Sequence, residues 1–512
     1  MRGTALNVLI RNDEGAVAAT YALALTGLIM IAGVGFDYGR LAAMDSELQN
    51  GADQAALAGA TQLNGASGAC SRASAAALGL VTNTTVVAND SSTVSITAEP
   101  ACDATGNIKF WQDKNRATAA TSDATAHFIE VTVATRSVDY AFTPITGLIH
   151  GSSFAVAMAG LGSSVCKVPP VFLCNPAEST DPVFNVANYI GKGVRLIANT
   201  GGSNYTPGNF GYLEANAGNG AQAISQALGR TTIPGDCVSA DSVTTKPGQQ
   251  VSVLDALNTR FDVYANGLNQ ACGGNNGLCP PSANSKKDLT HKGNSNSCAF
   301  ANGGGSGWQE ATKPYLPSSA TTPLTTAQIA QTSPMGYPRD MCHAVSLSGS
   351  CSGGKIGTGT WDSNAYFKTN STNYASNFDV TGTFGTSTPT RYQVYKYEAA
   401  NSANRLQNQS DGSNTAIPQP YCVTPGIAVG GASIDRRVLS VAIVNCQAQG
   451  VQGATSGVTV NKWIDVFLTE PSVNRSRTAQ SDVYVEVIGP TTLGGGSTAA
   501  QLIRRDVPYL VN

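Results

Sequence analysis

The strongest constraint on this chain of 512 residues is an uncharged, apolar run of 22 residues at positions 15–36. A helix rises about 1.5 Å per residue, so about 20 residues cross the roughly 30 Å hydrocarbon core of a membrane. A secretory signal peptide has a shorter apolar region that ends in a small-x-small cleavage site, whereas Asp37-Tyr38-Gly39-Arg40 follows this run. We therefore predict a retained transmembrane helix at residues 15–36.

Charges on either side of the run predict its orientation. Arg2 and Arg11 precede it, whereas only Arg40 follows, close to Asp37. The excess of basic residues before the run favours a cytoplasmic N-terminus at residues 1–14. We expect a single-pass protein of the inner (cytoplasmic) membrane, with the bulk of the chain in the periplasm.

The helix is expected to continue beyond the membrane as an amphipathic neck at residues 37–65. Apolar residues recur in this segment at steps of three and four, which is the spacing of one helical face. This neck stripe consists of Leu41, Met44, Leu48, Ala52 and Ala55. Asn64-Gly65 is the stop signal at its end.

Small residues fall near one face of the predicted transmembrane helix. They are Gly15, Ala19, Ala22, Thr26 and Gly33. Small side chains let a second transmembrane helix approach closely, so this face is suited to a partner helix. Alanine and glycine are also common in membrane helices, and a face without a partner stays open as the alternative.

Twelve cysteines and only four histidines are scattered along the chain, and no C-x-x-C motif occurs. Zinc needs tight clusters of thiolate or imidazole ligands, so we expect no metal and no cofactor. An even set of cysteines behind an apolar anchor predicts disulfides formed in an oxidising compartment. Because short-range pairing closes loops at low entropic cost, we predict the pairs Cys70–Cys102, Cys166–Cys174, Cys342–Cys351 and Cys422–Cys446.

The remaining chain predicts an α+β protein, in which the transmembrane and neck helix is followed by largely β, loop-rich, disulfide-stapled periplasmic domains. Residues 66–165 are expected to form a first α+β domain whose strands cover the neck helix. Those strands are predicted from alternating apolar residues at 93–97, 107–112, 128–133 and 138–142.

Residues 166–512 are expected to form a second region, rich in strands and loops. Its middle, 266–385, is rich in Gly, Asn, Ser and Thr, and its cysteines suggest stapled loops. Strands are predicted at 437–444, 462–468 and 483–488, the first two inside a sheet, and a short helix at 255–264. Arg436-Arg437 precedes the first of these strands and is expected at an exposed edge.

Three pieces of sequence stand in order near the N-terminus: EGAVA at 14–18, FDYGR at 36–40 and LQNGADQAALA at 48–58. Together with the apolar run they resemble the N-terminal TadE/TadG-type membrane region of TadG-like Flp pilus assembly proteins. The resemblance implies a single-pass inner-membrane protein of a tight-adherence, type IV-like pilus system, without catalytic activity. The partners that it implies are the Tad/Flp pilus machinery, namely pseudopilins and platform proteins, together with inner-membrane lipid.

Many TadG-like proteins also carry a von Willebrand A domain, whose metal site needs D-x-S-x-S after a buried strand. The loose match in this chain is Asp411-Gly412-Ser413-Asn414-Thr415, and the residues before it are mostly polar. We interpret the match as a turn, so a metal-dependent adhesive role is not supported.

Composition and motifs exclude other classes of function. The chain has 31 basic and 33 acidic residues, so it lacks the basic excess that nucleic acid binding requires. Cys342-His343 is the first candidate for a nucleophile pair, but a disulfide of Cys342 with Cys351 is favoured. We expect no catalytic residues and no small-molecule substrate.

The leading hypothesis is a non-enzymatic, membrane-anchored component of Flp pilus assembly that docks onto pseudopilins or the secretion platform. The alternatives are a surface or periplasmic adhesin or binding module anchored by one helix, and a periplasmic hydrolase with a site that no motif marks. Genes for a prepilin peptidase and a secretion ATPase beside this one would favour the first.

We predict that the anchor stays uncut at Gly15-Ala16, which resembles the junction cut in Flp pilins and pseudopilins. Pilins carry a Glu five residues into the mature chain, whereas the fifth residue after this junction is Thr20. A threonine cannot neutralise the new ammonium group, and a lone charge in hydrocarbon is costly. Mass spectrometry of the mature N-terminus checks the prediction. A chain that begins at Ala16, or that is recovered from sheared pili as a major subunit, would contradict it.

Overall fold

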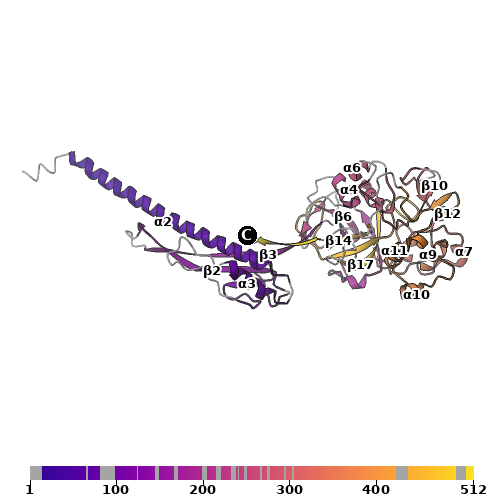
Figure 1. The fold of residues 1–512 in the computed structure, drawn as a ribbon, viewed down its shortest axis with the longest axis horizontal. Helices are drawn as coiled ribbons and strands as arrows, with labels where there is room; N and C mark the ends of the chain where they lie inside the picture. Colours follow the sequence, from indigo (N-terminus) through magenta and orange to yellow (C-terminus); the bar gives the residue numbers. More distant parts are fainter. Residues whose placement is uncertain are drawn as a thin grey trace, which may run out of the picture. The chain divides into compact units, whose positions relative to one another are not determined.

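The structure, a computed structural model, separates the chain into two compact units (Figure 1). Unit 1 comprises Met1–Gly162 with Asp506–Asn512, and unit 2 comprises Ser163–Arg505. The final segment therefore belongs to unit 1, outside the 166–512 region expected from the sequence. The residues that the structure describes are 14–64, 67–80, 99–123, 125–143, 149–166, 171–198, 204–214, 221–231, 238–239, 242–246, 251–265, 268–273, 277–292, 296–301, 305–422, 436–491 and 503–511.

A single helix, α2 (Glu14–Ala60), joins the apolar run to the neck. Between positions 17 and 32 its side chains are exposed all round, apart from the half-buried Gly27. It is long and apolar enough to cross a membrane. Towards its C-terminal end one face becomes buried in protein, and the helix stops at Ala60, slightly before the expected stop. The predicted N-terminal apolar helix with a continuous neck is confirmed.

Unit 1 packs α2 and α3 (Ala69–Leu80) against one face of a sheet (Figure 1). The strands of unit 1 pair in the order β1 (Ile108–Trp111), β2 (Phe128–Asp139), β3 (His150–Cys166) and β18 (Ile503–Leu510). The neck stripe supplies much of the core: Met44, Leu48, Ala52 and Ala55 are fully buried and Leu41 is partly buried. The small residues allow close approach, because a Cβ on Gly59 would lie 2.5 Å from Ile129 Cδ1.

β2 and β3 form a long antiparallel hairpin whose pairing runs from Phe128↔Gly160 to Asp139↔His150. Ile129, Val131 and Val133 alternate towards the helices and are fully buried. The strand predicted at 138–142 stops at Asp139, and the residues after it take another role at the helix. The strand predicted at 93–97 lies outside the described residues.

Unit 2 is built on a closed barrel. The barrel strands are β4 (Val171–Cys174), β14 (Val438–Val444), β16 (Lys462–Leu468), β17 (Asp482–Pro490), β5 (Gly193–Ala198) and β6 (Asn209–Leu213). They pair in that order, and β4 also pairs with β6, which closes the ring. Closure leaves no open sheet edge among these six strands, which removes a route to aggregation. The interior strands predicted at 437–444 and 462–468 are confirmed as β14 and β16.

One set of alternating barrel residues shares the largest core with the helices α4 (Ala221–Gly229), α5 (Val251–Asn258) and α6 (Asn269–Cys272). α5 and the 3-10 turn η3 (Thr259–Phe261) confirm the helix predicted at 255–264. Phe467 on β16 belongs instead to an aromatic core with α7, α9 and α11. The remaining helices are η2 (Val186–Asn188), α7 (Thr326–Ile329), α8 (Met341–Ala344), α9 (Ser363–Thr369), α10 (Val380–Phe384), α11 (Arg391–Ala400) and α12 (Ser402–Arg405).

The other strands of the described residues are short, and only β9 among them joins the barrel sheet. They are β7 (Val238–Ser239), β8 (Ser242–Val243), β9 (Thr245–Lys246), β10 (Leu289–Lys292), β11 (Trp308–Glu310), β12 (Gln409–Asp411), β13 (Asn414–Ala416) and β15 (Val458–Thr459). β12 and β13 form a tight hairpin in which Asp411 pairs with Asn414 and Gly412 has a φ of 66°. The loose metal-site match at Asp411 is therefore the predicted turn.

Five disulfides are present in the described residues, and two of the four predicted pairs are among them. Cys70–Cys102 and Cys342–Cys351 are confirmed, and a third short bridge joins Cys272 to Cys279. The predictions for Cys166–Cys174 and Cys422–Cys446 are wrong, since the bonds are Cys174–Cys446 and Cys298–Cys422. The barrel explains the error, because it sets β4 beside β14 and so brings residues 272 apart in sequence to bonding distance.

Removing the long-range bridge should cost unit 2 more stability than removing a short one. Loop-closure entropy predicts a loss of about 5.6 kcal/mol for Cys174→Ala/Cys446→Ala, against about 2.6 kcal/mol for the matched pair Cys342→Ala/Cys351→Ala, which closes a loop of nine residues. Denaturant unfolding of the full chain in detergent measures both. Equal losses would show that chain entropy does not govern these bridges.

Candidate functional site

The apolar run of α2 ends at a carboxylate that is buried by its own domain. Asp37 is 2% exposed and accepts backbone N–H groups from Ala141, Phe142 and Thr143 at 2.8, 2.9 and 2.6 Å. The Thr143 hydroxyl donates a fourth hydrogen bond to it at 2.7 Å. We call this arrangement of Asp37 with residues 141–143 the Asp37 clamp. It ties the chain that leaves β2 to the point where the helix changes from apolar to amphipathic.

Further contacts between α2 and the hairpin lie on either side of the clamp. The rings of Phe36 and Phe142 meet edge to face, with centroids 5.7 Å apart. The Arg40 guanidinium donates to the Asp139 carbonyl at 3.1 Å. A Cβ on Gly33 would lie 2.5 Å from Phe142 Cβ, so the helix is close to the hairpin at this point because Gly33 has no side chain.

Of the small residues predicted to form a packing face on the membrane helix, some are exposed and one is covered by the protein's own hairpin. Gly33 is buried against the protein's own Phe142. Ala19, Ala22 and Thr26 are exposed, and the Thr26 hydroxyl donates to the Ala22 carbonyl at 2.7 Å. The side chain of Gly15 lies outside the described part of the chain. A partner helix at the three exposed positions stays a prediction.

The hydrogen bonds within the clamp stabilise the charged form of Asp37. Burial by itself would raise the pKa of the Asp37 carboxyl, but the hydrogen bonds from Thr143, Ala141 and Phe142 outweigh burial and hold the pKa far below its usual range. A carboxyl whose pKa is depressed on folding contributes stability above the unfolded pKa of about 4 and loses it as the pH falls further. The clamp should therefore be intact throughout the neutral and mildly acidic range.

Replacing Asp37 by Asn should release the chain at 141–143. The amide of Asn presents one acceptor oxygen, and its NH₂ group cannot accept the remaining N–H groups. We expect faster hydrogen exchange at the amides of Ala141, Phe142 and Thr143 in the full chain. Asp45→Asn is the matched control, since Asp45 lies on the same helix, is exposed and accepts a hydrogen bond from the Ser153 hydroxyl of the same hairpin. Unchanged exchange in Asp37→Asn would refute the clamp.

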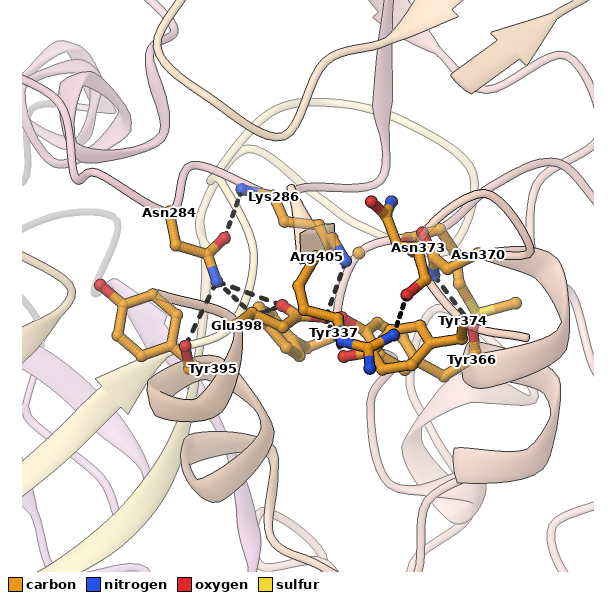
Figure 2. A network of polar contacts seen from close by, with 12 residues as sticks. Asn284, Lys286, Tyr337, Tyr366, Asn370, Asn373, Tyr374, Tyr395, Glu398 and Arg405 are labelled. Carbon is orange, nitrogen blue, oxygen red and sulfur yellow. Dashed lines mark hydrogen bonds and ion pairs between the residues drawn. The ribbon is translucent and has the colours of Figure 1, made fainter. Parts of the chain in front are cut away.

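A second concentration of polar groups lies inside unit 2, around Glu398 on α11 (Figure 2). This carboxylate is fully buried and accepts hydrogen bonds from five side chains. The donors are Tyr337 at 2.5 Å, Tyr366 at 2.5 Å, Tyr374 at 2.7 Å, Lys286 at 2.7 Å and Asn284 at 3.1 Å. We call these six residues the Glu398 network.

The protonation states of the network follow from its burial. Burial first, and then the charge of Glu398, raise the pKa of Tyr337, Tyr366 and Tyr374, so the three phenols stay protonated and donate. Burial lowers the pKa of Lys286, and the Glu398 carboxylate opposes that shift. With its acceptor positions occupied, Glu398 is suited to hold elements together rather than to bind a ligand.

The other end of α11 is held by charges as well. Glu486 on β17 accepts the backbone N–H groups of Arg391 and Tyr392, both at 2.9 Å, and the Arg391 guanidinium pairs with Asp340 and Glu486. Sequence reasoning missed α11 and its carboxylate. The start of the helix could have been predicted, because Thr390 and Gln393 form a capping box. The role of Glu398 could not, because its hydrogen-bond donors come from distant segments of the chain.

The sequence predicted Arg436 and Arg437 at an exposed edge, but both side chains are buried, with exposures of 1% and 0%. Arg437 donates to the carbonyls of Leu468, Thr469 and Lys286, each at 2.9 Å. Its guanidinium also lies over aromatic rings, with that of Phe261 at 4.4 Å. The prediction was wrong because backbone carbonyls and ring faces compensate these charges, and such partners leave no trace in the flanking sequence.

The candidate nucleophile pair is not available for catalysis. Cys342 is bonded to Cys351, so neither sulfur is a thiolate, and the same holds for Cys70 and Cys102 beside Asp123. Burial lowers the pKa of His343 to about 4, so its ring is neutral at pH 7. The ring lies between the Tyr484 hydroxyl at 2.8 Å and the Gly354 carbonyl at 3.0 Å. Both clusters are therefore structural rather than metal-binding.

Among the clefts on the described part of unit 2 are two of a few hundred Å³. One, of about 320 Å³, is lined by Asp255, Asn258, Phe300 and Gln480 among others, and burial raises the pKa of Asp255 to about 6. No second titratable side chain is among the described residues that line it. The other, of about 430 Å³, lies beside α9 and α10, where aromatic and hydroxyl side chains line it.

Among the described residues, one helix is long and apolar enough to span a membrane, and it belongs to the first of the two compact units. The family model Tad, described as Flp pilus-assembly TadE/G-like, matches residues 15–77. The match covers the apolar run, Asp37 of the clamp and most of α3. The N-terminal region is therefore of the TadE/G-like type, and the resemblance found in the sequence is confirmed. No curated protein and no solved structure gives a significant match to the chain.

Disrupting the Glu398 network should destabilise unit 2 strongly. Glu398→Gln leaves the buried Lys286 ammonium without its counter-ion, and breaking a buried pair in this way costs about 3–5 kcal/mol. Denaturant unfolding of the full chain measures the loss. Glu310→Gln, at a partly exposed acceptor for Ser476, is the matched control and should change stability by less than about 0.5 kcal/mol.

A double variant separates the ion pair from the rest of the network. Lys286→Met/Glu398→Gln removes both charges, so it should lose less stability than the two single variants together. If the single variant Glu398→Gln unfolds like the unmodified protein, the network is not what holds α11 in place.

Proposed function

We propose that this protein is a non-enzymatic, membrane-anchored component of Flp (tight-adherence) pilus assembly. The observation that carries the proposal is the coincidence of the TadE/G-like match at 15–77 with the apolar helix and the Asp37 clamp. The family match supports a role related to Flp pilus assembly. The proposal adds that the chain works from the inner membrane, with its N-terminus in the cytoplasm and both units in the periplasm.

Charge and cysteine chemistry support that orientation. Arg2 and Arg11 precede the apolar run, and basic residues are retained on the cytoplasmic side of a membrane helix. Five disulfides in the described residues favour an oxidising compartment for both units.

A structural rather than catalytic role is supported by how the polar groups are used. Cys342 is in a disulfide, His343 is held between two hydrogen-bond partners, and Glu398 is surrounded by donors. The barrel, with α11 held against it by buried ion pairs and hydrogen bonds, is suited to present a fixed surface to other proteins. We propose that this surface docks onto pseudopilins or platform proteins of the secretion machinery.

A clean deletion of the gene tests the proposal. We expect the deletion strain to lack Flp pili, counted by electron microscopy of sheared material, and the full-length gene to restore them. The Glu310→Gln variant, for which we expect little change in stability, should restore them equally. Crosslinking in intact membranes followed by mass spectrometry should then identify pseudopilins or platform proteins bound to the chain.

The adhesin alternative predicts a different result in the same strain. The cleft beside α9 and α10 carries Phe367, Tyr374 and Phe378 next to several serines, and such a surface could bind a ligand. An adhesin would leave pili at normal numbers in the deletion strain and reduce only attachment. That outcome would replace the assembly role with a binding role.

A further inference from the structure

Apolar side chains gather where the helix leaves its apolar run. Phe36 and Tyr38 on α2 are 54% and 71% exposed, and Phe142 and Ile149 on the facing hairpin are 49% and 60% exposed. We call residues 140–143 with Ile149 the hairpin tip. Large apolar residues exposed together usually mark a surface that is covered in the functional state.

The position of the tip along the helix shows what could cover it. About 20 helical residues cross the hydrocarbon core, so a span that begins at position 15 reaches its other side near position 34. Phe142 packs against Gly33 and Phe36, which lie within one helical turn of that level. The tip is therefore beside the helix at the depth of the membrane boundary, where the exposed rings of Phe36 and Phe142 are in contact.

The backbone N–H groups of the tip have hydrogen-bond partners within the protein, as a position near hydrocarbon requires. The backbone N–H groups of Ala141, Phe142 and Thr143 all donate to Asp37, and the N–H of Tyr140 donates to the Ile149 carbonyl at 3.0 Å. Backbone groups near hydrocarbon need partners within the protein, because lipid offers none. The clamp supplies them and at the same time surrounds the Asp37 charge with donors.

We propose that the hairpin tip is a second membrane contact, which inserts Phe142 and Ile149 into the headgroup–acyl boundary of phospholipids beside α2. Tyr side chains are favoured at this boundary because a ring and a hydroxyl suit its two sides, which fits the exposed Tyr38 beside the tip, while Phe142 and Ile149 would bury apolar area among the acyl chains. The inference rests on membrane anchoring by α2. Because α2 and the sheet share one core, a second contact would keep unit 1 from rotating about the axis of α2, so the membrane would set its orientation.

Photo-crosslinking in native membranes tests this contact on the full-length protein. Benzoyl-phenylalanine replaces Phe142, and the adducts formed on irradiation are identified by mass spectrometry. Phe154 is the matched control, because it is also an exposed phenylalanine of the hairpin, at 60%, but its neighbour Ser153 contacts Asp45. Asp45 is eight residues beyond Asp37, about 12 Å further from the membrane. Leu25, 60% exposed in the middle of the apolar run, is the positive control.

We expect phospholipid adducts at positions 25 and 142, with at least a tenfold lower yield at 154. No lipid adduct at 142 while 25 reacts would overturn the second contact and leave the anchor standing. Equal yields at 142 and 154 would also overturn it, as would a protein adduct in place of lipid at 142. Failure at 25 would remove the membrane anchor itself, and with it both the proposed function and this contact.

Discussion

The hydrogen bonds of Asp37 are the interaction on which unit 1 depends. A carboxylate at the end of an apolar helix would ordinarily need water or a cation, and neither is favoured close to hydrocarbon. Three backbone N–H groups and a hydroxyl take that role, so the charge and the turn of the chain stabilise each other. Because the donors follow β2 directly, the clamp also fixes where the sheet meets the helix, and the neck stripe can then pack against it.

In unit 2 too, buried charges are compensated by hydrogen bonds and ion pairs from within the protein, and more residues take part. α11 has Arg391 at one end, paired with Asp340 and Glu486, and Glu398 near the other, surrounded by phenols, an amide and an ammonium. Buried charges of this kind add little net stability over an apolar core, but they penalise every packing that leaves one unpaired. The barrel and its helices are therefore held in one arrangement.

The errors of sequence reasoning share a cause. Cys174 and Cys446 pair across the barrel, and Arg437 finds carbonyls and aromatic rings from distant segments. Bridges between sequence neighbours, such as Cys342–Cys351, could be predicted because loop-closure entropy favours short loops. Long-range bridges depend on which strands become neighbours, and the pairing of β4 with β14 left no pattern in either strand.

Local sequence was sufficient for the continuous α2, its apolar and amphipathic halves, the inner strands β14 and β16 and the turn at Gly412. Each follows from the spacing of apolar residues or from backbone freedom within a few positions. The function of Asp37 and Glu398 could not be found in that way, although Asp37 stands in a motif that the family resemblance includes. Their hydrogen-bond donors lie more than a hundred residues away for Asp37, and between 24 and 114 residues away for Glu398. A buried carboxylate acquires its role only when folding removes water and brings such donors within 3 Å or so, and no local pattern encodes that meeting.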